Sequence, residues 1–182
     1  IERGMVYSST NMVILACLCD DEIIIVENGV VSIGKSAFSN NDTLRSVILP
    51  PSVKYIENSA FSNCTNLETV NLSNSTQIIG EYAFSYCQSI KRIDLPSTIV
   101  YIGANSFRGC VNLESIELPQ LMTSMEDGLL LGCEKLKNVK LPGVLVKIGK
   151  KSFSGCSRIE EIQLPDSLSI IDDYAFEKRR RC

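Results

Sequence analysis

The sequence contains no histidine and no tryptophan in its 182 residues. Histidine is the commonest general base and a common metal ligand, so its absence excludes Ser-His and Cys-His nucleophile pairs. No apolar run reaches the roughly 18 residues that a membrane-spanning helix needs. The formal net charge is -3, which provides no overall basic field for nucleic acid. We therefore expect neither membrane insertion nor a nucleic-acid partner.

What the sequence does contain is a repeat of 23 residues. Three apolar columns recur at this interval and define a unit L-x-x-I-x-L, as in Leu113, Ile116 and Leu118. Proline usually follows, as at Pro119, and ends the strand because it has no backbone N–H to donate. Leu130 occupies the one position of the phenylalanine column that lacks phenylalanine. The column itself consists of Phe38, Phe61, Phe84, Phe107, Phe153 and Phe176.

A unit of this length with one short strand cannot bury its apolar side alone, so successive units must stack on one another. The repeat therefore predicts a solenoid with a parallel strand in each coil. A further apolar column lies downstream of the strand and is usually followed by glycine, which favours a left-handed backbone at that point. These glycines are Gly34, Gly80, Gly103 and Gly149.

The full unit, L-x-x-I-x-L-P-x-x-V-x-x-I-G-x-x-A-F-x-x-C, repeats from about Ile24 to Phe176. It closely resembles the BspA-like group of leucine-rich repeats. The resemblance implies an α/β-type leucine-rich repeat solenoid, with parallel strands on one face and short turns or 3-10 segments on the other. We expect about seven units over residues 23–182. We expect residues 1–22 to form a β-hairpin cap, because repeat arrays need atypical ends. The repeat containing Met122, Met125 and Leu130 departs most from the pattern and predicts local repacking.

Five of the eight cysteines also recur on the 23-residue grid. We expect them to form a column of buried thiols, because unpaired cysteine packs as a small apolar residue. Disulfides between neighbouring coils are the alternative, although side chains in one column point in parallel. A zinc site favours paired ligands such as C-x-x-C, and none occurs. Cys17 and Cys19 would face opposite sides of a strand, so we expect no metal site and no cofactor.

One outward-facing column alternates in charge: Arg45, Glu68, Lys91, Glu114, Lys137 and Glu160. Opposite charges on adjacent strands attract, so this column predicts a charge ladder that satisfies itself. A row that recognises a ligand is the alternative. The neighbouring columns lack such alternation, and there we select Arg92, Asp94, Glu117 and Lys140 as a candidate protein-binding face. A plain solvated sheet face is the alternative for these residues.

Four N-x-S/T sequences are candidate glycosylation sites in a secreted protein. Asn41, Asn71 and Asn74 are the favoured acceptors, whereas Asn63 precedes a column cysteine and is expected to be poorly accessible. A glycan on Asn71 would obstruct the candidate binding face. Glycosylation and binding there are therefore competing hypotheses.

The resemblance implies a non-catalytic protein-interaction module at the cell surface or outside the cell. Its expected partner is a protein, such as an extracellular matrix or cell-surface protein bound in adhesion. A rigid spacer within a larger surface protein is the alternative function. No phosphate-binding glycine loop is present, and acidic clusters such as Asp20, Asp21 and Glu22 are typical of turns. We therefore expect no catalytic residues.

Overall fold

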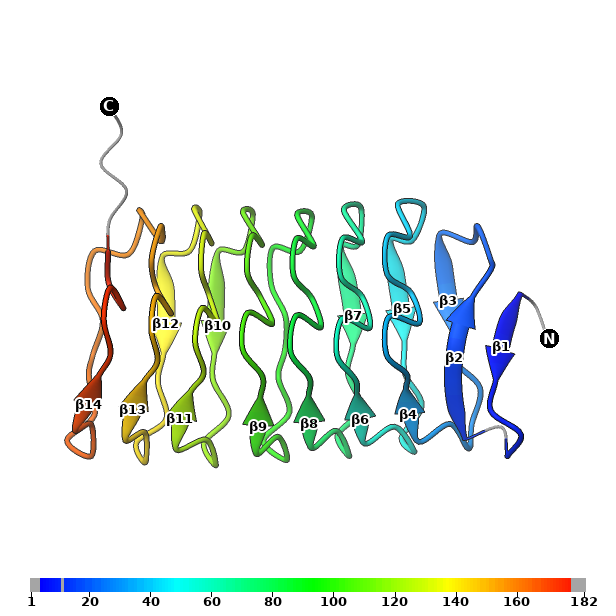
Figure 1. The fold of residues 1–182 in the computed structure, drawn as a ribbon, viewed down its shortest axis with the longest axis horizontal. Helices are drawn as coiled ribbons and strands as arrows, with labels where there is room; N and C mark the ends of the chain where they lie inside the picture. Colours follow the sequence, from blue (N-terminus) through cyan, green and yellow to red (C-terminus); the bar gives the residue numbers. More distant parts are fainter. Residues whose placement is uncertain (1–3, 11, 178–182) are drawn as a thin grey trace.

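The computed structural model describes residues 4–10 and 12–177. The described chain winds into a parallel β-solenoid of about seven coils (Figure 1). No helix of any kind occurs in the described residues, so turns stand where the sequence allowed 3-10 segments. Residues 23 apart in the sequence lie side by side in successive coils, and this confirms the solenoid fold predicted from the repeat.

The L-x-x-I-x-L segments form one row of parallel strands, which we call the primary row. Its register joins residues 23 apart, as in Ser46 with Thr69 and Val47 with Val70. The middle residue of each strand is less exposed than at least one neighbour, because successive side chains point to opposite faces, and it is buried in every strand but the last, where Val139 is half-buried. The strands are β3 (Ile23–Ile25), β5 (Ser46–Ile48), β7 (Thr69–Asn71), β10 (Ser115–Glu117) and β12 (Asn138–Lys140).

Each coil also carries a second short strand that the sequence analysis did not predict. These strands form a separate row along the lower part of Figure 1, which we call the secondary row. They cover the apolar column that precedes the glycines, so this column belongs to a sheet as well. The strands are β4 (Ser32–Ile33), β6 (Tyr55–Ile56), β8 (Ile78–Ile79), β9 (Tyr101–Ile102), β11 (Ser124–Met125), β13 (Lys147–Ile148) and β14 (Ile170–Ile171).

The third side of each coil is a turn segment that carries the phenylalanine. Its backbone N–H groups donate to the next coil along the whole stack, as from Phe38 to Ala60 and from Phe84 to Ser106, both at 2.8 Å. The bond continues at Leu130, which donates to Ser152 at 2.9 Å. This side therefore joins the coils without interruption, although none of it is strand.

The two strand rows are interrupted at different coils. The secondary row has no pairing between β9 and β11, beside the atypical repeat. The phenylalanine stack is also interrupted there, because Leu130 separates Phe107 from Phe153. The predicted local repacking of this repeat is confirmed. The primary row is interrupted one coil earlier, where Arg92 makes only an isolated bridge to Ser115.

The N-terminal end carries an antiparallel hairpin of β1 (Met5–Tyr7) and β2 (Val13–Cys17). β2 pairs in parallel with β4, so the hairpin extends the secondary row by two strands. The primary row ends at β3 and receives no such extension. The expected hairpin is thus present, but it continues only one of the two rows.

The core is one continuous apolar cluster inside the stack, to which several columns of the repeat contribute. Phe38, Phe61, Phe84 and Phe107 lie face to face, with ring centroids 5.0, 5.3 and 5.6 Å apart. Identical rings at a constant interval can stack because each coil repeats the backbone of the one before. Aromatic pairs at this separation contribute roughly 0.5–1.5 kcal/mol beyond the burial of their area.

The glycine column has a different cause from the one predicted. Gly34, Gly80, Gly103 and Gly149 are not among the residues with positive φ. A Cβ at Gly103 would lie 2.6 Å from the backbone nitrogen of Glu81. Close approach of neighbouring coils therefore selects glycine here.

Left-handed backbone occurs instead on the turn side, at two positions of the repeat unit. Asparagine and glycine suit this conformation, but serine, tyrosine and lysine also adopt it here. The first position holds Ser36, Ser59, Tyr82, Asn105, Gly128, Lys151 and Tyr174. The second holds Asn40, Asn63, Tyr86, Gly109, Gly132 and Gly155.

Candidate functional site

The five cysteines of the repeat are buried and unbridged, as predicted. Each thiol donates to the carbonyl of the residue 26 positions earlier, as from Cys110 to Phe84 at 3.2 Å. Burial raises the pKa of Cys64, Cys110 and Cys156 to about 12. A reactive cysteine needs a thiolate and access to solvent, so this column is structural.

Cys17 and Cys19 form a disulfide, with their Cα atoms 5.4 Å apart. The expectation that they face opposite sides of a strand was wrong, because residues two apart on a strand point to the same face, and because β2 ends at Cys17 with Cys19 beyond it. In the described residues, no group of three or more His, Cys, Asp or Glu side chains is arranged to hold a metal. The same part of the chain contains no helix long and apolar enough to cross a bilayer.

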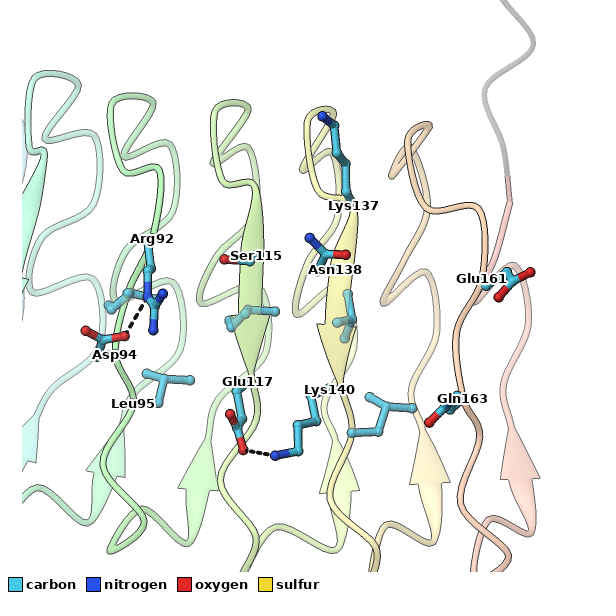
Figure 2. A pocket seen from close by; sticks show the side chains of 14 residues that line it. Arg92, Asp94, Leu95, Ser115, Glu117, Lys137, Asn138, Lys140, Glu161 and Gln163 are labelled. Carbon is cyan, nitrogen blue, oxygen red and sulfur yellow. Dashed lines mark hydrogen bonds and ion pairs between the residues drawn. The ribbon is translucent and has the colours of Figure 1, made fainter.

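The outer face of the primary row contains an open hollow of about 650 Å³. It spans the coils from Arg92 to Gln163, and Figure 2 shows its side chains. All four residues selected from the sequence line it: Arg92, Asp94, Glu117 and Lys140. The structure thus brings together residues that are up to 48 positions apart (140 − 92 = 48).

Strand β10 and strand β12 form the floor of the hollow, and their register places Glu117 beside Lys140. Lys140 Nζ donates to Glu117 Oε1 at 2.7 Å across the two strands. Arg92 Nε donates to Asp94 Oδ1 at 2.8 Å within one segment. The two candidate cations are therefore both paired with candidate carboxylates, as Figure 2 shows.

Both ion pairs are open to solvent. The side chains of Arg92 and Asp94 are 75% and 82% exposed, and those of Lys140 and Glu117 are 67% and 60% exposed. Exposed pairs of this kind typically contribute about 0.2–1 kcal/mol. A ligand that supplies competing charges can therefore displace them at little cost in free energy.

Further residues of the hollow were missed as candidates by the sequence analysis. Lys137 belongs to the column of alternating charge, and Asn138, Glu161 and Gln163 lie in the other outward-facing columns. With them the hollow has three cations, Arg92, Lys137 and Lys140, and three anions, Asp94, Glu117 and Glu161. Its formal charge is zero, so selectivity for a ligand would come from the pattern of charges and amides. These additional residues could have been identified from the sequence, because they lie in the outward-facing columns of the repeat.

Residues 17–133 and 77–181 match the family model of the BspA type leucine-rich repeat region, a model of six repeat copies. The chain belongs to the BspA-type leucine-rich repeat family. No curated protein matches it.

Solved structures of other leucine-rich repeat proteins are similar to this chain. One from Bacteroides ovatus is 30% identical and covers 97% of the chain, with a TM-score of 0.89. The chain spans 50% of that protein's length. A leucine-rich repeat protein of T. pallidum is 26% identical over 86% of this chain and 87% of its own, with a TM-score of 0.66. A leucine-rich cell-surface protein of Faecalibacterium prausnitzii is 30% identical over 75% of this chain and 37% of its own, with a TM-score of 0.70.

The charge ladder of this BspA-type chain forms only at its N-terminal end. Arg45 pairs with Glu68 at 2.9 Å and with Glu22 of the preceding coil at 3.5 Å. Within the described residues, no ion pair joins the remaining steps from Glu68 to Glu160. The ladder prediction was therefore wrong beyond Glu68. The interruption of the primary row between β7 and Arg92 accounts for the step from Glu68 to Lys91, but Glu114 and Lys137 form no ion pair although β10 and β12 are in register.

The candidate glycosylation sites differ in their surroundings. Asn41 is half-buried, and its side-chain amide donates to the Cys19 carbonyl at 3.2 Å, while Asn71 and Asn74 are exposed. Asn63 is also exposed, contrary to expectation. Its left-handed backbone turns it outward although the next residue is buried. Glycosylation at Asn41, Asn71 and Asn74 stays a prediction. Asn71 and Asn74 are the more accessible of the three side chains.

Proposed function

We propose that the chain is a non-catalytic protein-interaction module that binds an extracellular matrix or cell-surface protein through the hollow of the primary row. The observation that carries this proposal is the cluster of exposed, weakly held ion pairs on a rigid face. Charged side chains positioned by a fixed backbone can exchange internal partners for partners on a ligand. A location at the cell surface or outside the cell is part of the proposal, and the similarity to the leucine-rich cell-surface protein of F. prausnitzii supports it.

The test compares the wild-type chain with a double variant, Arg92→Glu and Lys140→Glu, on a biosensor. The ligands are a panel of purified extracellular matrix and cell-surface proteins. We expect the variant to lose at least about tenfold in affinity for any ligand that the wild type binds, because both changes place like charges beside Asp94 and Glu117.

A matched control carries Lys35→Glu and Lys54→Glu, two exposed lysines outside the hollow. It makes the same change in net charge and should bind as the wild type does. Equal losses in both variants would show a non-specific charge effect. Unchanged binding by the Arg92 and Lys140 variant would reject the hollow as the binding face.

A rigid spacer in a larger surface protein is the second candidate. The uninterrupted hydrogen bonds of the turn side and the stacked phenylalanines favour it, because both resist bending of the stack. In that case the hollow is inert, and the wild-type chain binds no protein of the panel.

A further inference from the structure

The N-terminal end of the primary row leaves a strand edge open. β3 pairs with β5 on one side only, while the hairpin continues the secondary row instead. Alternate residues of a strand direct their backbone groups to opposite edges. Glu22 and Val26 bond toward β5, the first by its carbonyl and the second by its N–H. The N–H and carbonyl groups of Ile23 and Ile25 therefore face the open edge.

None of the hydrogen bonds among the described residues reaches the outward backbone groups of Ile23 and Ile25. Their side chains are also exposed, by 61% and 64%, and that of Ile48 on the next strand by 40%. The register places Ile48 beside Ile25. An exposed apolar edge strand is a template for pairing with another chain, and native proteins usually cover or charge it.

Acidic residues flank this edge on both sides. Asp20, Asp21 and Glu22 precede β3 and Glu27 follows it, and all four are exposed. Of these four, only Glu22 has an ion-pair partner among the described residues, namely Arg45. The edge is thus an apolar strand between carboxylates.

We propose that the open edge of β3 captures an extended polypeptide segment that has apolar residues at its centre and basic residues at its ends. The segment adds a strand to the primary row, and its backbone pairs with the outward groups of Ile23 and Ile25. Its apolar side chains cover Ile23, Ile25 and Ile48, and its basic residues meet the flanking carboxylates. A symmetric pair of copies joined through their β3 edges does not fit, because antiparallel pairing of the two edges would bring Glu22 of each copy near Glu27 of the other. Like charges on adjacent strands are destabilising.

The test uses fluorescence anisotropy with a labelled synthetic peptide, in which alternating valine and threonine residues are flanked by two arginines at each end. We expect saturable binding to the wild-type chain. A peptide with glutamate in place of arginine should bind at least about tenfold more weakly, as should the first peptide at high salt. Equal binding of the arginine and glutamate peptides would overturn the charge complementarity.

Two further peptides keep every side chain of the first but carry N-methyl groups on alternate backbone amides. One is methylated on the odd-numbered amides and the other on the even-numbered amides. Methylation on the docking edge removes the N–H donors, so one of the two peptides should lose binding and the other should retain it. Retention by both would show that the peptide does not pair as a strand. This arm uses the unaltered protein and needs no variant to fold.

The protein arm compares two double variants, one with Ile23→Lys and Ile25→Lys and the other with Ile78→Lys and Ile170→Lys. Ile78 of β8 and Ile170 of β14 are exposed isoleucines of the secondary row, so the second variant adds the same charge and serves as the matched control. We expect loss of peptide binding only in the variant with Ile23→Lys and Ile25→Lys. Light scattering at the same concentrations should show a monomer; a dimer that Ile25→Lys dissociates would overturn the proposal in favour of self-pairing. The variant with Arg92→Glu and Lys140→Glu should bind the peptide normally, which separates this edge from the hollow.

Discussion

At the scale of single residues, the column cysteines show how the repeat makes ordinary groups inert. Each thiol is withdrawn from water, and this burial holds the pKa of all five thiols above the usual value. Desolvation is the main cause, because burial disfavours the charged thiolate.

Alkaline pH should therefore destabilise the chain through these thiols. The folded pKa lies above the unfolded value of 9.0, so the unfolded chain loses protons first as pH rises. For Cys110, stability is fully present below pH 9.0 and declines toward about pH 12, by about 1.4 kcal/mol per pH unit. Urea unfolding of Cys110→Ala across this pH window should show a shallower decline than the wild type. An identical decline would show that Cys110 is not desolvated.

Stacking predicts a graded response in the phenylalanine column. Phe84 is fully buried between Phe61 and Phe107, so Phe84→Ala should lower the free energy of unfolding by about 3–5 kcal/mol. Phe176 is 38% exposed and, among the described residues, stacks on Phe153 alone, so Phe176→Ala should give a distinctly smaller loss. Denaturant unfolding measures both free energies of unfolding. Equal losses in the two variants would show that an interior ring contributes no more to stability than a ring at the end of the stack.

At the scale of the coil, close approach of backbones decides which residues are allowed. The repeat suggested a left-handed glycine, but the structure shows a glycine beside the backbone of the preceding coil. Glu57, Glu126 and Asp172 occupy the same column elsewhere, so the contact is not equally close in every coil.

This difference predicts the outcome of two alanine substitutions. Gly103→Ala forces a Cβ against the backbone of Gly80 and Glu81 and should cost about 1–3 kcal/mol. Gly143→Ala meets nothing within 4 Å and should be neutral or slightly stabilising, because it reduces the freedom of the unfolded chain. Thermal unfolding of the two variants checks this, and a harmless Gly103→Ala would remove the packing explanation.

At the scale of the whole molecule, each coil contacts only its neighbours, so stability is distributed along the stack. The last described coil is packed on one side: Ile171 is 50% exposed, whereas Ile148 in the coil before has no exposed surface. A repeat that lacks one neighbour loses that interface and opens more readily.

Hydrogen exchange should follow this order. In this chain, the amides of Ile170 and Asp172 donate to the preceding coil and should exchange faster than that of Gly149, which donates to Met125 inside the stack. Mass spectrometry after timed deuteration measures the difference. Equal protection of both coils would indicate a single cooperative unit instead of a graded one.

The sequence by itself determined the period, the identity of the buried columns, the inert thiols and the four residues that line the hollow. A constant interval places like positions above one another, and burial of the apolar columns leaves little freedom in that arrangement. Only the tertiary structure decided the second strand row, the partners of Arg92 and Lys140, the Cys17–Cys19 disulfide and the open edge of β3. These depend on where the backbone turns and where the hairpin docks. The repeat period specifies neither the turns nor the docking of the hairpin. The period reflects the burial of apolar columns, and exposed ion pairs and the ends of the strand rows contribute little to that burial.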